Sequence, residues 1–122
     1  MGESRQGKGE ALERTELMRN SSQFREVFEK GKVVRGKYVT VFFKGGQARK
    51  IGFALKRDLR GAVKRNRVKR RLKEIYRKEK RRIDPRVELV LVADKRTEGL
   101  DYHSLRGDLL ETLRGAGILK NG

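Results

Sequence analysis

The stretch 56–82 constrains the fold most, because it combines a very high positive charge with apolar residues at helical spacing. It holds fifteen Lys or Arg against three Asp or Glu, which is +12 of the chain's net charge of +17. Its apolar residues recur at intervals of three and four and so share one helical face: Val68, Leu72, Ile75 and Tyr76. We expect a helix over 62–82 whose apolar face packs on an apolar layer. The Lys and Arg side chains around the rest of this helix form a cationic arc.

The cationic arc of this helix has few acidic neighbours. Only Glu74 and Glu79 lie within it, whereas a solvated basic helix usually pairs its cations with acids three or four residues away. The excess charge therefore indicates a polyanionic partner, most commonly nucleic acid. An anionic membrane and a disordered basic tail are the rival interpretations. The helical apolar spacing opposes the tail, and the lack of Trp and of any apolar run near ~20 residues opposes the membrane.

A short helix is predicted ahead of the basic stretch, over residues 21–30. Asn20 and Gln23 stand at the spacing of a capping box, in which each side chain accepts a hydrogen bond from the other residue's backbone N–H. Gly31 follows the last helical residue, so it is expected to end the helix in the left-handed conformation.

Three strands and a last helix complete the predicted fold. Residues 32–44 and 49–56 are expected to pair as an antiparallel hairpin, because Gly45-Gly46 permits a turn between them. Residues 87–93 are almost continuously apolar, which is typical of a central strand. The helix over 102–114 should turn four leucines inward: Leu105, Leu109, Leu110 and Leu113. The predicted order is α-β-β-α-β-α, an α/β chain of the two-layer α+β kind with helices packed on a small sheet.

A single domain is predicted over residues 17–117, between a flexible tail at 1–16 and a short tail at 118–122. The chain has no Cys, which excludes disulfides and thiolate metal sites. Charged residues make up 40% of it, with one Pro and no Trp, a composition that suits a thermophilic source.

Residues 62–74 resemble the signature helix of the bacterial ribonuclease P protein component. Their sequence, AVKRNRVKRRLKE, is similar to the family pattern A-V-x-R-N-R-x-K-R-x-hydrophobic-R-E, with Lys73 where Arg is usual. Three further blocks resemble the family's first helix, basic strand and last helix: residues 24–31, 49–57 and 100–110. One such block would be weak, but the four stand in the family's order and span about 17–114.

The resemblance implies both a fold and a role. The fold is like domain 2 of ribosomal protein S5, with a left-handed β-α-β crossover where the general rule would favour a right-handed one. The role is that of the protein subunit of ribonuclease P, whose partners are the catalytic RNA and precursor tRNA with its 5′ leader. The RNA would carry the active site and most of the Mg²⁺, with no catalytic residue and no tightly bound metal in the protein. A cytoplasmic protein is implied, with no membrane and no obligate protein partner.

The same resemblance assigns two binding surfaces. The first would contact the catalytic RNA and comprises Arg57, Arg60, Arg65, Asn66, Arg67, Lys69, Arg70 and Lys73. The second would bind the leader between the first helix and the sheet and comprises Phe24, Phe28, Tyr38, Val41 and Lys56. Aromatic rings stack on unpaired bases with little sequence preference, which suits varied leaders. Without the resemblance, phenylalanines four residues apart favour a core role, so Phe24 and Phe28 are interpreted as serving both purposes.

Two other functions stay open on the residues alone. A structural ribosomal protein would share the charge and the small α+β size. A stand-alone nuclease would need clustered carboxylates or histidines for metal-dependent hydrolysis, whereas the acids here are scattered and there is one His. The four ordered blocks favour the ribonuclease P subunit over both.

Overall fold

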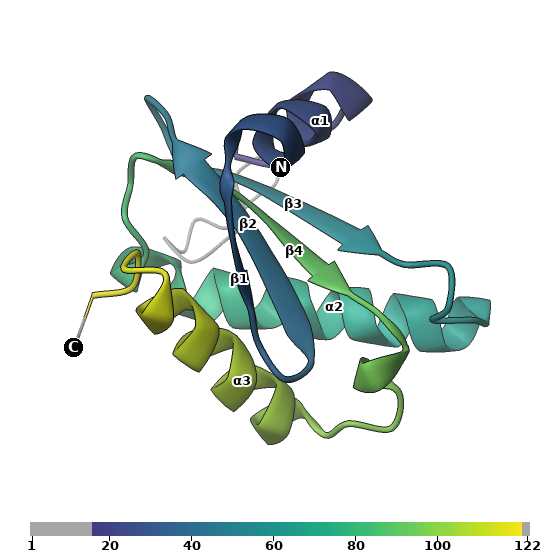
Figure 1. Cartoon of the computed structure of the whole chain (residues 1–122). Coiled ribbons are helices and arrows are strands. Elements are labelled where there is room, and N and C mark those ends of the chain that lie inside the picture. Colours follow the sequence, from purple (N-terminus) through teal and green to yellow (C-terminus); the bar gives the residue numbers. More distant parts are fainter. Residues whose placement is uncertain (1–15, 121–122) are drawn as a thin grey trace, which may run out of the picture.

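A computed structural model of the chain describes residues 16–120 (Figure 1). Its elements, in chain order, are α1 (Ser21–Lys30), β1 (Lys32–Arg35), β2 (Val39–Gly45), β3 (Lys50–Leu55), α2 (Ala62–Glu79), the short 3-10 helix η2 (Lys80–Arg82), β4 (Val87–Ala93), the 3-10 helix η3 (Lys95–Thr97) and α3 (Tyr102–Gly115). The predicted α+β class is confirmed, and the predicted bounds of the first helix, the last helix and the apolar strand hold to within one residue. The basic helix was predicted to end at 82, but α2 ends at Glu79 and the last three residues form the 3-10 helix η2.

The four strands lie in the order β1-β2-β4-β3. β4 is central as predicted, antiparallel to β2 and parallel to β3, and α2 is the connection between β3 and β4. The predicted hairpin between 32–44 and 49–56 is wrong, because β4 lies between β2 and β3. β4 is the most apolar strand, and in this central position it is hydrogen-bonded to a neighbouring strand on each side.

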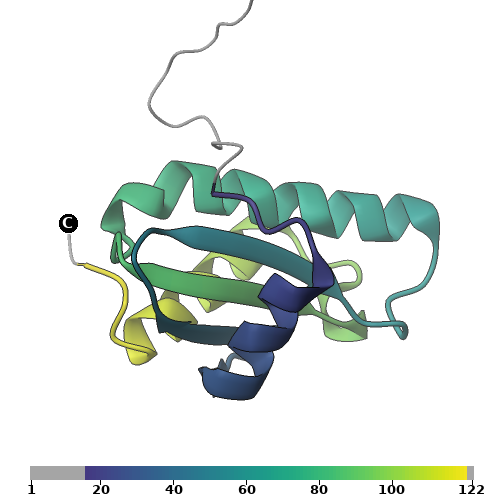
Figure 2. The same ribbon diagram turned by 90° about the horizontal axis from the view of Figure 1, so that it is seen from above.

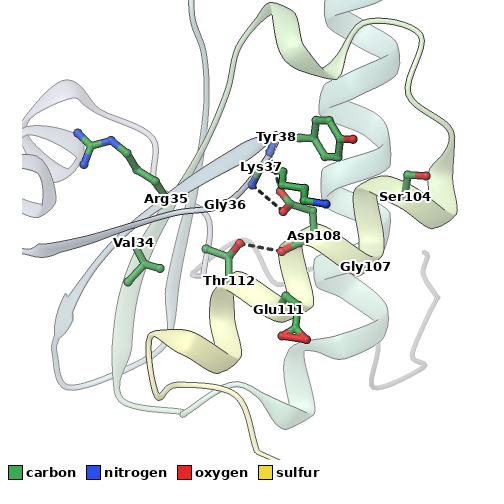
Figure 3. Close-up of a pocket in the computed structure, with 10 residues that line it drawn as sticks. All are labelled: Val34, Arg35, Gly36, Lys37, Tyr38, Ser104, Gly107, Asp108, Glu111 and Thr112. Carbon is green, nitrogen blue, oxygen red and sulfur yellow. Dashed lines mark hydrogen bonds between the residues drawn. The ribbon is translucent and has the colours of Figure 1, made fainter.

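The segment 32–44, predicted as one strand, is two strands that pair with each other. β1 and β2 form an antiparallel hairpin in which Val34 lies opposite Val41. The turn between them is held from α3, where the Asp108 carboxylate accepts hydrogen bonds of 2.8–3.1 Å from three successive backbone N–H groups: Lys37, Tyr38 and Val39 (Figure 3). A Cβ at Gly36 would collide with the side chains of Thr112 and Asp108, so only glycine fits at the start of the turn.

Both faces of the sheet are covered, but unequally. In Figure 1 α1 lies above the sheet and α2 and α3 lie below it, and Figure 2 shows α1 and α2 on opposite sides. The inner face, toward α2 and α3, holds the larger core, which includes Val39, Val41, Ile51, Leu89, Leu91, Leu72, Ile75, Tyr76, Leu105, Leu109 and Leu113. The outer face, toward α1, holds a smaller cluster of Met18, Val27, Val90 and Val92. Since α1 is short, it covers only one end of the outer face.

The predicted buried face of the basic helix is confirmed. Val68, Leu72, Ile75 and Tyr76 are all 5% exposed or less. The four inward leucines of α3 are buried as well, at 6% or less. α2 therefore lies with its apolar side on the sheet and beside α3, and its cations are left around the outside.

The ends of the described chain are tied to the core. The Glu16 carboxylate accepts hydrogen bonds of 2.8 Å from Tyr76 Oη and from Lys80 Nζ, all in buried positions. Ile118 and Leu119 are also buried, so the packed domain extends two residues beyond the predicted boundary at 117. The tail predicted at 1–16 lies outside the described residues except for Glu16 itself, which is in the core network.

The start of α1 follows the prediction and its end does not. Asn20 Oδ1 accepts from the Gln23 N–H at 3.1 Å, and Gln23 Oε1 accepts from the Asn20 N–H at 3.3 Å, which completes the capping box. Gly31 was predicted to be left-handed, but it has φ −88° and ψ 176°, an extended conformation. Glycine is required there for space, because a Cβ would lie 2.5 Å from Val27 O and 2.6 Å from Phe43 O.

The crowding at Gly31 predicts a loss of stability on adding one methyl group. We expect Gly31→Ala to lower the free energy of unfolding by about 1–3 kcal/mol, since the methyl group meets backbone oxygens. Gly107 is the matched control, because it lies inside α3 and a Cβ there would have nothing within 4 Å. Gly107→Ala should raise the free energy of unfolding by about 0.5–1 kcal/mol. Urea denaturation measures both, and a Gly31→Ala variant as stable as the parent chain would contradict the packing described.

Candidate nucleic-acid interface

Several cations on the N-terminal two thirds of α2 and in the loop before it are not used inside the described part of the protein. Within residues 16–120, no side-chain hydrogen bond or ion pair engages seven of the predicted RNA-contacting residues: Arg57, Arg60, Asn66, Arg67, Lys69, Arg70 and Lys73. Six of them are exposed and Lys73 is half-buried. We call these seven residues the α2 cationic surface.

The cations at the other end of α2 are paired. Arg77 and Lys78 lie 2.7 and 3.4 Å from Glu74. Glu79 lies 2.9 Å from Arg82 and 2.8 Å from Arg106 of α3. Burial alone would raise the pKa of Glu79, but the hydrogen bonds from Arg106 and Arg82 outweigh it and hold that pKa below its usual value. The two acidic residues of α2 thus lie toward its C-terminal end, and its unpaired cations lie toward its N-terminal end.

The start of α2 adds to the positive potential of this surface. Gly61 precedes the helix with φ 93°, a conformation that favours glycine, and no side chain caps the free N–H groups. The first turn has no acidic residue. The positive end of the helix dipole therefore adds to the field of the neighbouring cations instead of being neutralised.

Arg65, the first arginine of the R-N-R sequence, is used differently from its neighbours. Its guanidinium donates hydrogen bonds to three backbone carbonyls, two in the loop between β3 and α2 and one at the end of β3: Leu59 at 2.7 Å, Lys56 at 2.9 Å and Leu55 at 3.4 Å. The side chain thereby holds the loop that carries Arg57 and Arg60. Its predicted contact with RNA stays a prediction, but the hydrogen bonds give it a structural role that the sequence did not reveal.

Three aromatic rings meet on the outer face, where α1 crosses the sheet. Phe28 and Phe42 pack edge to face with ring centres 4.8 Å apart, and Phe24 lies 6.4 Å from Phe28. Phe24 rests on β3 so closely that a Cβ at Gly52 would lie 2.6 Å from its ring. Phe28 is 39% exposed, so its ring is accessible beside the uncovered part of the sheet. We call Phe24, Phe28 and Phe42 the aromatic patch.

Two residues predicted for the leader site lie elsewhere. Val41 has no exposed surface and belongs to the inner core, facing α2 and α3. Tyr38 lies on the turn between β1 and β2, beside α3 and packed against the inner core (Figure 3). Phe42 takes the place predicted for Val41, because neighbouring residues of a strand point to opposite faces, whereas Tyr38 precedes β2 and does not follow its alternation. The alternation was visible in the sequence, but which face α1 would cover was not.

Lys56 links the two surfaces. Successive residues of β3 point to opposite faces of the sheet, and Gly52 and Ala54 lie on the outer face. Lys56 follows on the same side, about 13 Å beyond Gly52 at roughly 3.3 Å per residue. Arg57 and Arg60 come next, in the loop that leads into α2. Three exposed cations therefore follow one another in the chain between β3 and α2: Lys56, Arg57 and Arg60.

Across residues 16–120, no group of three or more His, Cys, Asp or Glu is placed to hold a metal ion. None of the helices in this part of the chain is long and apolar enough to cross a membrane. The chemistry that the described surface supports is binding of a polyanion, with aromatic rings available for unpaired bases.

Known proteins share both the sequence and the fold. Residues 12–117 match the family Ribonuclease P. The chain is 30% identical over 105 residues to the ribonuclease P protein component of Natranaerobius thermophilus, a match that covers 84% of this chain and 91% of that one. The solved RNase P protein of Thermotoga maritima is 28% identical, with a TM-score of 0.74 over 82% of this chain and 96% of that one. The RNase P protein of Staphylococcus aureus, at 18% identity, shares the fold with a TM-score of 0.79 over 86% and 98%.

The different partners of Arg65 and Arg70 predict different effects of removing them. Arg70→Ala should reduce the dependence of RNA affinity on salt by about one unit of slope, with an unchanged melting temperature, because it removes one free phosphate-binding cation. Arg65→Ala should instead destabilise the protein by about 1–3 kcal/mol, because three carbonyls lose a charged donor. Salt titrations of RNA binding and thermal melts separate the two. An Arg65→Ala variant that melts like the parent chain and loses salt slope as Arg70→Ala does would refute the structural role.

Proposed function

The chain belongs to the ribonuclease P protein family, and we propose that it is the RNA-binding subunit that assists a catalytic RNA in removing the 5′ leader from precursor tRNA. The ribonuclease P protein component is part of an endoribonuclease complex, so the chain contributes to RNA cleavage as a member of an assembly. The observation that carries the proposal is the α2 cationic surface, whose charges have no partner within residues 16–120.

The α2 cationic surface suits the catalytic RNA as partner. Cations that release condensed counterions from RNA give strong, salt-dependent binding that needs no particular sequence. Arg67 and Arg70 offer planar guanidinium groups that bind phosphate through two hydrogen bonds, and Asn66 offers both a donor and an acceptor for a base edge or a 2′-OH. Because α2 is fixed along its whole buried face, these groups are already in place before RNA binds.

The aromatic patch suits the leader. A 5′ leader is single-stranded, so its bases are free to stack on Phe28 and Phe42 beside the uncovered sheet. Lys56 extends from the same face toward the loop with Arg57 and Arg60, and it would hold the phosphates that follow. The leader would then pass from the aromatic patch to the RNA bound on α2, which places the cleavage site at the junction of the two surfaces.

In this proposal the RNA carries out catalysis and binds the Mg²⁺ ions. The described residues hold no carboxylate or histidine cluster for a metal ion. The contribution of the protein is to hold the leader against the RNA. By linkage, anything that tightens binding of the substrate also tightens binding of the Mg²⁺ ions that the RNA takes up together with it.

Reconstitution tests the proposal directly. At low Mg²⁺, adding the purified chain to a bacterial ribonuclease P RNA should stimulate removal of the leader from precursor tRNA, and the chain alone should cleave nothing. Lack of stimulation across a full protein titration would refute the proposed role. Cleavage by the chain that survives nuclease treatment would contradict the assignment of catalysis to the RNA.

The leader site is tested by the most exposed ring of the aromatic patch. Phe28→Leu keeps an apolar side chain but removes the stacking face, so affinity for precursor tRNA should fall about fivefold or more, as expected for one stacked base. Affinity for mature tRNA, which lacks the leader, should not change. Val63→Ala, at a 70% exposed position on α2, is a control for loss of apolar surface outside the patch. Equal losses of affinity for precursor tRNA and for mature tRNA would indicate that Phe28 has a purely structural role.

A further inference from the structure

A cavity of about 540 Å³ lies between α2 and the start of α3. Its lining residues are Arg67, Arg70, Arg71, Glu74 and Tyr102. We propose that this cavity binds one unpaired nucleotide of the RNA partner, with the base stacked on Tyr102 and the phosphate held by Arg67 and Arg70. The inference rests on the proposed function for the presence of RNA at α2, and it assigns a new site to α3.

Tyr102 provides a fixed ring at the edge of the cavity. It is the first residue of α3, directly after Asp101, whose carboxylate accepts from the Ser104 N–H at 2.7 Å and so fixes the start of the helix. Lys78 Nζ lies 5.8 Å from the ring centre, and the ring of His103 meets it edge to face at 5.9 Å. The ring is half-buried, and its hydroxyl has no hydrogen-bond partner within residues 16–120. A ring held in this way stacks on a base at little cost in conformational entropy.

The arginines of the cavity divide into one fixed group and two free ones. Arg71 donates a hydrogen bond of 2.6 Å to the Leu100 carbonyl, which ties α2 to the segment before α3 and makes a rigid wall. Arg67 and Arg70 are three residues apart on α2, and within the described chain their guanidinium groups have no partner. They are therefore available for a phosphate at the mouth of the cavity.

Glu74 orients the nucleotide in the cavity. Its carboxylate lies 2.7 Å from Arg77 and 3.4 Å from Lys78, and the hydrogen bond from Arg77 is the main reason that the pKa of Glu74 is lowered. The group is thus ionised at neutral pH. A carboxylate repels phosphate but accepts hydrogen bonds from the amino and imino groups of bases. The base therefore enters toward Glu74, and the phosphate stays with Arg67 and Arg70.

A neighbouring cavity continues the path of the strand. It measures about 520 Å³, lies along residues 97–101 and shares Arg67 and Arg71 with the first. The two arginines thus stand between two hollows. A single unpaired nucleotide fits this arrangement better than a duplex, whose bases are stacked and paired and cannot enter a cavity.

The test compares variants of Tyr102 in the full-length chain, with a bacterial ribonuclease P RNA as the probe. Tyr102→Phe keeps the ring and should bind as the parent chain does. Tyr102→Leu keeps apolar volume without a stacking face, and it should bind at least about fivefold more weakly. Chemical probing of the complexes should show one unpaired nucleotide that is protected by the parent chain and by Tyr102→Phe but not by Tyr102→Leu. Tyr38→Ala, at a half-buried tyrosine on the other side of α3, should change neither affinity nor protection.

The outcomes separate this inference from the proposed function. If the parent chain neither binds nor stimulates the RNA, the proposed function fails and the nucleotide site fails with it. If the parent chain binds and Tyr102→Leu binds equally well with the same protected nucleotides, only the site is refuted. If Tyr102→Phe is as weak as Tyr102→Leu, the hydroxyl and not the ring is needed, and stacking is refuted. Thermal melts of each variant show whether a weaker complex reflects lost folding.

Discussion

The docking of α2 on the inner face of the sheet is the interaction on which the other features depend. Val68, Leu72 and Ile75 fix the helix by one side, and this decides which of its many cations point outward. Acids near the C-terminal end of α2 pair the cations there, Glu74 with Arg77 and Lys78, and Glu79 with Arg82. The cations of the α2 cationic surface have no side-chain partner in the described chain, and under the proposed function that imbalance would supply the affinity for RNA.

The sheet separates two binding surfaces because each of its faces is covered by different helices. α2 and α3 cover most of the inner face, whereas the short α1 leaves part of the outer face open beside Phe28 and Phe42. The loop after β3 passes from one face to the other, and Arg65 holds it through three carbonyls. Arg65, the first residue of the R-N-R sequence, thus holds the loop between the two surfaces, while its neighbours Asn66 and Arg67 remain free for the partner.

Local signals predicted the helices and the central strand, and long-range packing decided what they missed. Capping chemistry at Asn20 and apolar spacing in α2 act within a few residues, so sequence reveals them. The break between β1 and β2 at Gly36 depends on Asp108, which lies some seventy residues away in the sequence. The face of the sheet that Val41 occupies depends on where α1 lies. The roles of Arg65 and Tyr102 likewise depend on carbonyls and rings brought together by the fold. The α2 cationic surface was predictable because charge and periodicity coincide in one segment.

Directed cleavage from two positions tests most directly that the two surfaces bind different RNAs. The chain has no cysteine, so an iron chelate can be attached at a single introduced one, Lys69→Cys on α2 or Arg25→Cys on α1. In the reconstituted complex with precursor tRNA, radicals from position 69 should cut the catalytic RNA, and radicals from position 25 should cut the leader. Cuts in the leader from position 69, or in the same nucleotides from both positions, would contradict the division of the molecule described here.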